Sequence, residues 1–192
     1  MGPETTKTSR KPRADSIRNR ELLLEAAMQI FSAGGPQASL EAVARQAGVG
    51  IGTLYRHFPT REALFEAVYR HEVDHLGELA ELFSRDSDPV EALRKWLHAN
   101  VRLVATKKGM IEGLQLVAHG STELKAYSFE RLTSAIGLLL DRAVAAGEIR
   151  ADISPEDLLR TLVGIFYSQG MVDWQPAALR LVDVFVDGLR KR

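Results

Sequence analysis

The stretch from Ser39 to Arg61, SLEAVARQAGVGIGTLYRHFPTR, constrains the fold of this chain more than any other. Ser39 is a residue type favoured at helix N-caps, and apolar side chains then recur at the spacing of one helix face. They are Leu40, Val43, Ala44 and Ala47. Gly48 is expected to end this helix, because glycine adopts the left-handed conformation of a helix end without a steric clash. A second short helix is expected to open near Gly50 and to stop at Pro59.

The second helix of this hairpin is predicted to bury one face and to expose a polar one. Leu54 and Phe58 would point inward. The outward side chains would be those of Thr53, Tyr55, Arg56 and His57. Two short helices about a glycine turn form a helix-turn-helix, whose second helix enters the major groove of DNA. The residues alone leave one alternative open, a helical adaptor that uses the same hairpin to contact another protein.

The residue order around this hairpin resembles a known family signature. The string from Ala44 to Leu64 reads A-x-x-A-G-V-x-x-G-T-L-Y-x-H-F-x-x-R-E-A-L, which is similar to the signature of the tetracycline-repressor (TetR) family of bacterial transcription regulators. The preceding RNRELLLEAAMQIFSAGG, from Arg18 to Gly35, is similar to the opening helix of that family. The resemblance covers about the first third of the chain. It implies a homodimeric repressor that a small-molecule effector releases from a palindromic double-stranded DNA operator.

The resemblance also implies DNA contacts, residue by residue. Thr53 and Arg56 are expected to read base edges, with Arg56 forming two hydrogen bonds to guanine. Phosphate contacts are expected from Tyr55, His57, Thr60 and Arg61.

The start of the second hairpin helix lacks the polar side chains that are expected on a surface that contacts DNA bases. Gly50, Ile51 and Gly52 are expected at the DNA surface but offer no polar side chain, which favours recognition of DNA shape over direct base contacts. Ser39 either bonds a phosphate or only caps its helix, and the sequence does not separate the two.

Positive charge is concentrated near the N-terminus although the formal net charge of the chain is zero. The first 60 residues hold eight Lys or Arg and five Asp or Glu, whereas the rest hold seventeen and twenty. Arg18 and Arg20 are therefore expected to contact DNA phosphates. Residues 1–16 are expected to form a flexible basic arm, which either lies along the DNA or is a solvated tail.

The whole chain is predicted to be all-α, with about nine helices. The expected segments are 17–33, the two hairpin helices, 61–83, 89–107, 110–118, 122–146, and two helices that open at Pro155 and Pro176. We expect a DNA-binding domain over 17–60 and a ligand-binding and dimerisation domain over 61–192.

The composition excludes several classes of protein. Hydrophobic residues make up 45% and charged residues 26%, as in globular domains. No run of about 18 apolar residues occurs, so we expect no membrane span, and the polar start does not match a secretory signal. The chain has no cysteine, which excludes disulfides and thiolate chemistry. We therefore expect a cytoplasmic protein.

One motif suggests different chemistry, the H-E-x-x-H formed by residues 71–75, HEVDH. On a helix this spacing puts His71 and His75 on one face, where they can bind zinc beside Glu72 as general base. The further ligand of a zinc peptidase does not follow in recognisable form, and Asp74 adds a charge that such motifs usually lack. A zinc-dependent hydrolase and an incidental metal site remain alternatives. Core or pocket histidines are favoured, with no enzymatic activity, no catalytic or metal-ligating residue and no cofactor expected.

The resemblance implies a ligand pocket among the helices that follow residue 61. A ligand that prefers the DNA-incompetent arrangement would lower operator affinity. Candidate contacts are aromatic and polar residues on those helices. They are His71, His75, Trp96, Asn100, Met110, Gln115, His119, Tyr127, Phe166, Tyr167, Met171 and Trp174.

The last two helices are apolar on more than one face, so each needs more than one neighbour. A second copy of the chain would cover the second face and form a four-helix, two-fold interface. The alternative is a helix pair in the core of a monomer. The predicted interface residues are Leu158, Leu162, Ile165, Phe166, Leu179, Val182, Phe185, Val186 and Leu189.

Overall fold

The computed structural model describes residues 10–34, 39–113, 122–167 and 174–191. Within these ranges the chain forms eight helices and a single isolated antiparallel bridge, so the all-α prediction is confirmed. The helices are α1 (Arg10–Gly34), α2 (Leu40–Gln46), α3 (Ile51–His57), α4 (Arg61–Phe83), α5 (Pro89–Gly113), α6 (Thr122–Ala145), α7 (Pro155–Tyr167) and α8 (Trp174–Leu189).

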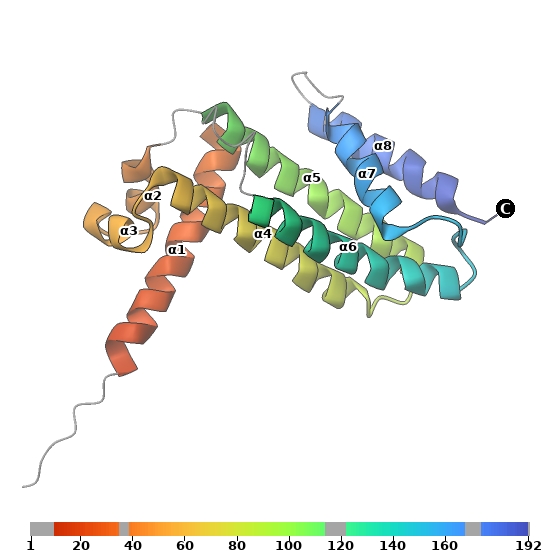
Figure 1. Cartoon of the computed structure of the whole chain (residues 1–192), viewed down its shortest axis with the longest axis horizontal. Coiled ribbons are helices and arrows are strands. Elements are labelled where there is room, and N and C mark those ends of the chain that lie inside the picture. Colours follow the sequence, from red (N-terminus) through yellow and green to blue (C-terminus); the bar gives the residue numbers. More distant parts are fainter. Residues whose placement is uncertain (1–9, 35–38, 114–121, 168–173, 192) are drawn as a thin grey trace, which may run out of the picture.

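Helices α1, α2 and α3 form an N-terminal head with the first turns of α4 (Figure 1). The apolar stripe of α1 is buried here, at Leu23, Leu24, Ala27 and Phe31. It packs against α2 and α3, and Phe31 meets Phe65 of α4 with ring centroids 4.4 Å apart. Helices of seven residues, such as α2 and α3, are unstable alone, so this packing is what holds them.

Helices α4, α5 and α6 pack pairwise into the body of the C-terminal bundle. Figure 1 shows α7 and α8 together beside this body, with α8 on α5 and α7 on α6. Trp96 of α5 is fully buried in the bundle, and its indole N–H donates to the Leu76 carbonyl of α4 at 2.7 Å. Burying so large a side chain with its polar atom satisfied stabilises the α4–α5 contact.

The helix α4 contributes to both hydrophobic clusters. Leu64, Phe65 and Val68 belong to the cluster of the head. Val73, Leu76 and Ala80, further along α4, belong to the cluster of the bundle. Tyr69 packs against both clusters. One continuous helix therefore connects the head to the bundle.

Most predicted helix ends are confirmed. Thr60 caps α4 by accepting from the Ala63 N–H at 3.1 Å, and Asp88 accepts from the Glu91 N–H at 2.9 Å where α5 begins. At the start of α7, Ser154 and Asp157 bond each other's backbone N–H at 3.2 Å in a reciprocal cap.

Three boundaries differ from the sequence prediction. Helix α1 begins at Arg10 rather than Ile17, so part of the expected flexible arm is helical. Helix α5 continues through the expected break at Gly109 to Gly113 and takes in the start of the expected helix 110–118, the rest of which lies outside the described residues. One glycine costs a helix only about 1 kcal/mol, so a long helix can contain it. Helix α8 begins at Trp174, before Pro176. Proline is tolerated in the first helical turn, because an N–H there would have no partner within the helix.

The domain boundaries stay predictions.

Replacing Trp96 with alanine should lower the free energy of unfolding by about 3–5 kcal/mol, because it leaves a large cavity between α4 and α5. Urea denaturation followed by circular dichroism, at one fixed protein concentration, measures this loss. Leu82→Ala is the control, because Leu82 is 56% exposed and should change stability by less than about 0.5 kcal/mol. Similar losses in the two variants would contradict the central position of Trp96.

Candidate nucleic-acid interface and ligand pocket

The hairpin from residue 39 to residue 58 has the geometry of a helix-turn-helix. Gly48 adopts a φ of +68° between α2 and α3, as expected of the glycine that ends the first helix. Leu54 and Phe58 are buried in the head. The other residues of α3 are exposed or half-buried, so this helix keeps one side open to a partner.

Ser39 caps α2 by accepting a hydrogen bond from the Ala42 N–H at 3.1 Å. The side chain is nevertheless exposed. A hydroxyl that accepts through its oxygen still has its own proton to donate. Capping and a phosphate contact are therefore compatible at this residue.

The predicted base-reading residues lie on the open side of α3. Arg56 is exposed and folds back along the helix, with Nε donating to the Gly52 carbonyl at 3.2 Å. Thr53 is half-buried, and the large side chains of Ile51 and Tyr55 are exposed. Exposed apolar and aromatic groups beside a guanidinium form a surface suited to base edges and thymine methyl groups.

Cationic side chains flank this surface. The Arg20 guanidinium lies over the Phe58 ring, 5.4 Å from its centroid, and the Arg61 guanidinium lies 5.2 Å from the Phe65 centroid. Stacking of this kind holds a guanidinium in place without neutralising its charge. Arg18 is exposed on α1, and the N-terminal turns of α1 project beyond the other helices (Figure 1).

The remaining predicted phosphate contacts lie at the end of α3 and the start of α4. His57 is half-buried, with its ring centroid 6.2 Å from that of Phe58. The Thr60 hydroxyl caps α4 and is exposed.

Gly50 and Gly52 have no steric reason within the chain to be glycine. Gly50 has a φ of −70°, and Gly52 is outside the left-handed region. A Cβ atom at either position would meet nothing within 4 Å. Because glycine weakens a helix interior relative to alanine, Gly52 lowers stability without helping the fold, whereas Gly50 is the N-cap of α3, a position where glycine is favoured over alanine.

A pocket of about 420 Å³ lies between the head and the bundle, lined from α1, α4, α5 and α8. Its apolar wall consists of Met28, Leu76, Leu79, Ala99 and Leu103. Its polar wall consists of Gln29, Glu72, His75, Arg102 and Gln175. The size and the mixture of apolar and polar groups suit a small organic molecule.

Comparison with known families identifies the fold and its role. Residues 23–68 match the family described as "Bacterial regulatory proteins, tetR family". Residues 88–191, more than half of the chain, match "Transcriptional regulator SbtR-like, C-terminal domain". The chain belongs to the TetR family of transcription regulators. The resemblance drawn from the string at residues 44–64 is confirmed, as is the DNA-binding helix-turn-helix.

Several relatives share this TetR fold. The TetR transcriptional regulator SCO0520 from Streptomyces coelicolor is 42% identical with a TM-score of 0.74, and the match covers 89% of this chain and 98% of that one. The repressor LfrR from Mycolicibacterium smegmatis is 37% identical over 87 residues, which are 45% of this chain and 46% of LfrR. The structure of LfrR from Mycobacterium smegmatis in complex with proflavine is 24% identical with a TM-score of 0.62, covering 88% and 95%. The sequence match to LfrR thus spans less than half the length of that repressor.

Among the ligand contacts predicted from the TetR resemblance whose side chains the structure describes, His75 alone lines the pocket. Trp96 and Asn100 are buried in the bundle instead, where the Asn100 amide donates to the Trp96 carbonyl at 3.0 Å. His71 is half-buried, and Phe166 packs edge-on against Trp174 at 6.1 Å. The side chains of five others lie outside the described residues. They are Met110, Gln115, His119, Tyr167 and Met171.

The sequence prediction missed the α1 side of the pocket. Met28 and Gln29 lie on the helix that was assigned only to DNA binding. The spacing of residues in the sequence does not show that α1 and α5 pack against each other. This wall of the pocket could therefore be identified only in the folded chain.

The H-E-x-x-H motif lies on α4. His75 is exposed, and its Nδ1 lies 3.8 Å from Glu78. In the part of the chain that the structure describes, no three His, Cys, Asp or Glu side chains gather as metal ligands would. Nor does any helix in that part have the length and apolar character of a membrane span.

The unusual residue of the motif, Asp74, connects α4 to α6. It accepts a hydrogen bond from the Tyr127 hydroxyl, and Arg131 Nε lies 3.4 Å away. The hydrogen bond to Asp74, together with burial, raises the pKa of Tyr127. Arg70 lies over the Tyr127 ring at 4.7 Å from its centroid and pairs with Glu66 at 3.1 Å. The acidic residue therefore has a structural role between two helices.

Most of the predicted dimer residues face the chain's own core. Six of the nine are buried within the single chain, namely Leu158, Leu162, Phe166, Val182, Val186 and Leu189. Ile165, Leu179 and Phe185 are partly buried and pack against the same core. The outer faces of α7 and α8 instead expose Val163, Leu181 and Val184. Periodicity showed two apolar faces but did not show which face the chain itself covers.

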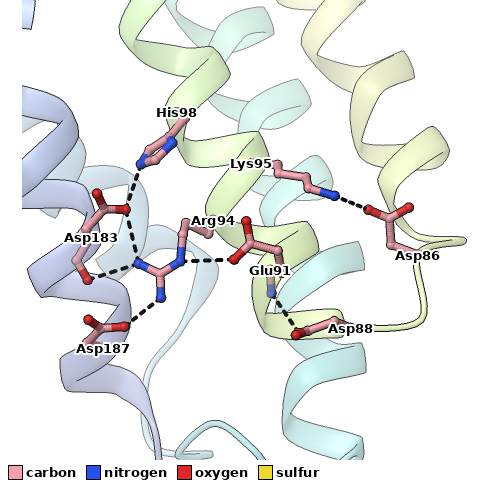
Figure 2. Close-up of polar contacts among 8 residues, drawn as sticks. All are labelled: Asp86, Asp88, Glu91, Arg94, Lys95, His98, Asp183 and Asp187. Carbon is pink, nitrogen blue, oxygen red and sulfur yellow. Dashed lines mark hydrogen bonds and ion pairs between the residues drawn. The ribbon is translucent and has the colours of Figure 1, made fainter. Parts of the chain in front are cut away.

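A polar cluster that the sequence analysis did not find joins α5 to α8 (Figure 2). Asp183 accepts from Arg94 at 3.1 Å and lies 2.8 Å from His98 Nε2, and Asp187 accepts from Arg94 at 2.6 Å. Burial lowers the pKa of Arg94, but hydrogen bonds to Asp187 and Asp183 outweigh this effect and leave it raised. The sequence contains a signal of this cluster. Two basic side chains, Arg94 and His98, are four residues apart, and so are the two acidic side chains Asp183 and Asp187.

Removing the shared carboxylate with Asp183→Ala should lower the free energy of unfolding by about 1–2 kcal/mol, because both Arg94 and His98 lose an acceptor. Asp187→Ala should cost less than about 1 kcal/mol, because that side chain is 64% exposed. Urea denaturation of the two variants side by side measures the difference. Equal losses would show that sharing of Asp183 adds nothing to stability.

Proposed function

We propose that this TetR-family protein is a homodimeric repressor, acting in the cytoplasm, that binds a palindromic operator and leaves it when a small molecule enters the pocket. The observation that carries the DNA-binding part is the open side of α3. There, Gly52, which lies inside the helix and has no steric reason within the chain to be glycine, precedes the exposed Arg56 by one helical turn. A glycine inside a helix that the fold does not need is explained by a partner that approaches the backbone closely.

The proposed DNA contacts divide into base reading and backbone contacts. Arg56 and Thr53 read base edges in the major groove, and Ile51 contacts a thymine methyl group. Phosphates are bound by the hydroxyls of Ser39, Thr60 and Tyr55, by His57, and by Arg18, Arg20 and Arg61. Gly50 and Gly52 let the start of α3 lie against the DNA, so shape contributes to recognition.

The outer face of α7 and α8 is proposed as the dimer interface. Val163, Leu181 and Val184 are exposed there, on two helices that pack against each other. A two-fold axis through this face presents two heads to two half-sites, which matches a palindrome with half-sites about one helical turn apart.

Release from the operator is proposed to follow from ligand binding between the head and the bundle. Relatives of this chain are named as repressors, and one of them, LfrR, has a solved structure in complex with proflavine. Because α4 is packed into both clusters, a ligand that shifts α4 in the bundle shifts its first turns in the head.

The test of this function is selection of bound DNA from a pool of random duplexes by the purified protein, followed by titration of the selected duplex at two salt concentrations. The proposal expects a palindrome bound by two chains, with an affinity that falls steeply as salt rises because counterions are released. Failure to enrich any duplex, with weak binding to all DNA, would contradict it.

The variant Gly52→Ala should separate folding from DNA binding. Its stability should rise by up to about 1 kcal/mol, whereas operator affinity should fall by about tenfold or more, because a Cβ meets the DNA. Gly137→Ala is the matched control on α6, where a Cβ would make ordinary contact with Pro155 at 3.6 Å. The control should leave operator binding unchanged. Unchanged operator binding by Gly52→Ala would contradict close approach of α3 to DNA.

The variant Val184→Asp should abolish the dimer, because Val184 is 70% exposed on the proposed interface and a buried, unpaired carboxylate there is unfavourable. Light scattering after size-exclusion chromatography should give the mass of one chain, with unchanged helical content. Leu82→Asp places the same charge on exposed α4 and should leave the dimer intact. A dimeric Val184→Asp protein would exclude this face as the interface.

A further inference from the structure

The pocket shares part of its wall with the DNA-reading head. Met28 and Gln29 line the pocket, although both belong to α1. Met28 also packs against the hydrophobic cluster of the head. Gln29 accepts a hydrogen bond from the side-chain amide of Gln46, on α2, at 3.1 Å. The pocket wall is therefore in contact with the helix-turn-helix without α4 in between.

We propose that a molecule bound in this pocket acts on the helix-turn-helix directly through α1, by displacing Met28 and Gln29 and breaking the Gln29–Gln46 hydrogen bond. This inference rests on the proposed function and adds a second route beside α4. The bond joins the pocket wall to the last residue of α2, next to the turn that positions α3.

The packing of α1 makes this route effective. Helix α1 contacts α2, α3, α4 and α5, so one helix carries both the head and the pocket wall. Ala27 precedes Met28 and is fully buried in the head. A helix moves as a rigid element over one turn, so a shift at Met28 also moves the buried stripe against which α2 and α3 pack.

The lining of the pocket indicates the class of molecule. The apolar wall provides a surface for an apolar body, and the amides of Gln29 and Gln175 provide donors and acceptors for a polar end. Glu72 and Arg102 bring one charge of each sign to the same wall. We therefore assign the pocket to an uncharged or zwitterionic amphipathic molecule that contacts Gln29.

The route can be tested with a covalent occupant, because the chain has no cysteine of its own. Gln175→Cys and Leu79→Cys place a single thiol at the α8 and α4 walls of the pocket. Benzyl methanethiosulfonate converts the thiolate to a benzyl disulfide and releases methanesulfinate, and dithiothreitol reverses the change. Leu82→Cys on exposed α4 is the control for a label outside the pocket. Each full-length protein is titrated with the selected operator before and after labelling.

Labelling at Gln175→Cys or Leu79→Cys should lower operator affinity by about tenfold, and dithiothreitol should restore it, whereas labelled Leu82→Cys should bind as before. In a Gln46→Ala background the loss on labelling should be about threefold smaller, because the hydrogen bond that the occupant breaks is already absent.

Two results would overturn the inference while leaving the proposed function intact. One is unchanged operator affinity after labelling at both pocket positions. The other is an equal loss with and without Gln46→Ala, which would show that the Gln29–Gln46 hydrogen bond does not transmit the effect. Failure of the unlabelled protein to bind any duplex is visible before labelling, and it would remove the basis of both proposals.

Discussion

The continuous packing of α4 through two hydrophobic clusters is the constraint on which the rest of the structure depends. Leu64 and Phe65 are buried in the head, Leu76 and Ala80 are buried in the bundle, and Tyr69 contacts both clusters. No glycine or proline interrupts the helix between Arg61 and Tyr69, and Gly77 is a site of close approach to Arg131 of α6 rather than a hinge. The head and the bundle therefore move relative to each other only if one of these two packed interfaces changes.

The contact between α8 and α5 differs in kind from the Trp96 contact between α5 and α4. Arg94, His98, Asp183 and Asp187 join α5 to α8 through charged hydrogen bonds at the edge of the core, whereas Trp96 anchors α5 to α4 inside it. Charged hydrogen bonds have defined directions, so they fix the register of α8 on α5 more sharply than apolar contact does. That register determines which side chains of α8 remain outside, among them Val184, and so sets the surface available to a second chain.

The sequence predicted local features well and relations between helices poorly, for a physical reason. The cap at Ser39, the turn at Gly48 and the inward positions Leu54 and Phe58 depend on neighbours within a few residues, and all are confirmed. The side of α8 that the chain itself covers, and the wall that α1 adds to the pocket, depend on packing between segments far apart in the sequence. A helical period locates an apolar face, but two faces of similar character, as on α8, leave the choice to the tertiary structure.

The helix α3, which is to contact DNA, contributes little stability of its own. Leu54 is its one buried residue, its N-cap Gly50 makes no side-chain hydrogen bond, and it spans only seven residues. A helix this short keeps its position through its neighbours, here α1 and α2, rather than through its own hydrogen bonds. A change in the position of α1 or α2 therefore also shifts α3, because α3 has little internal stability that would hold it in place. Because α3 has so few buried contacts of its own, its open face is available to DNA and also responds to a molecule that binds against Met28 and Gln29 on α1, the helix that supports it.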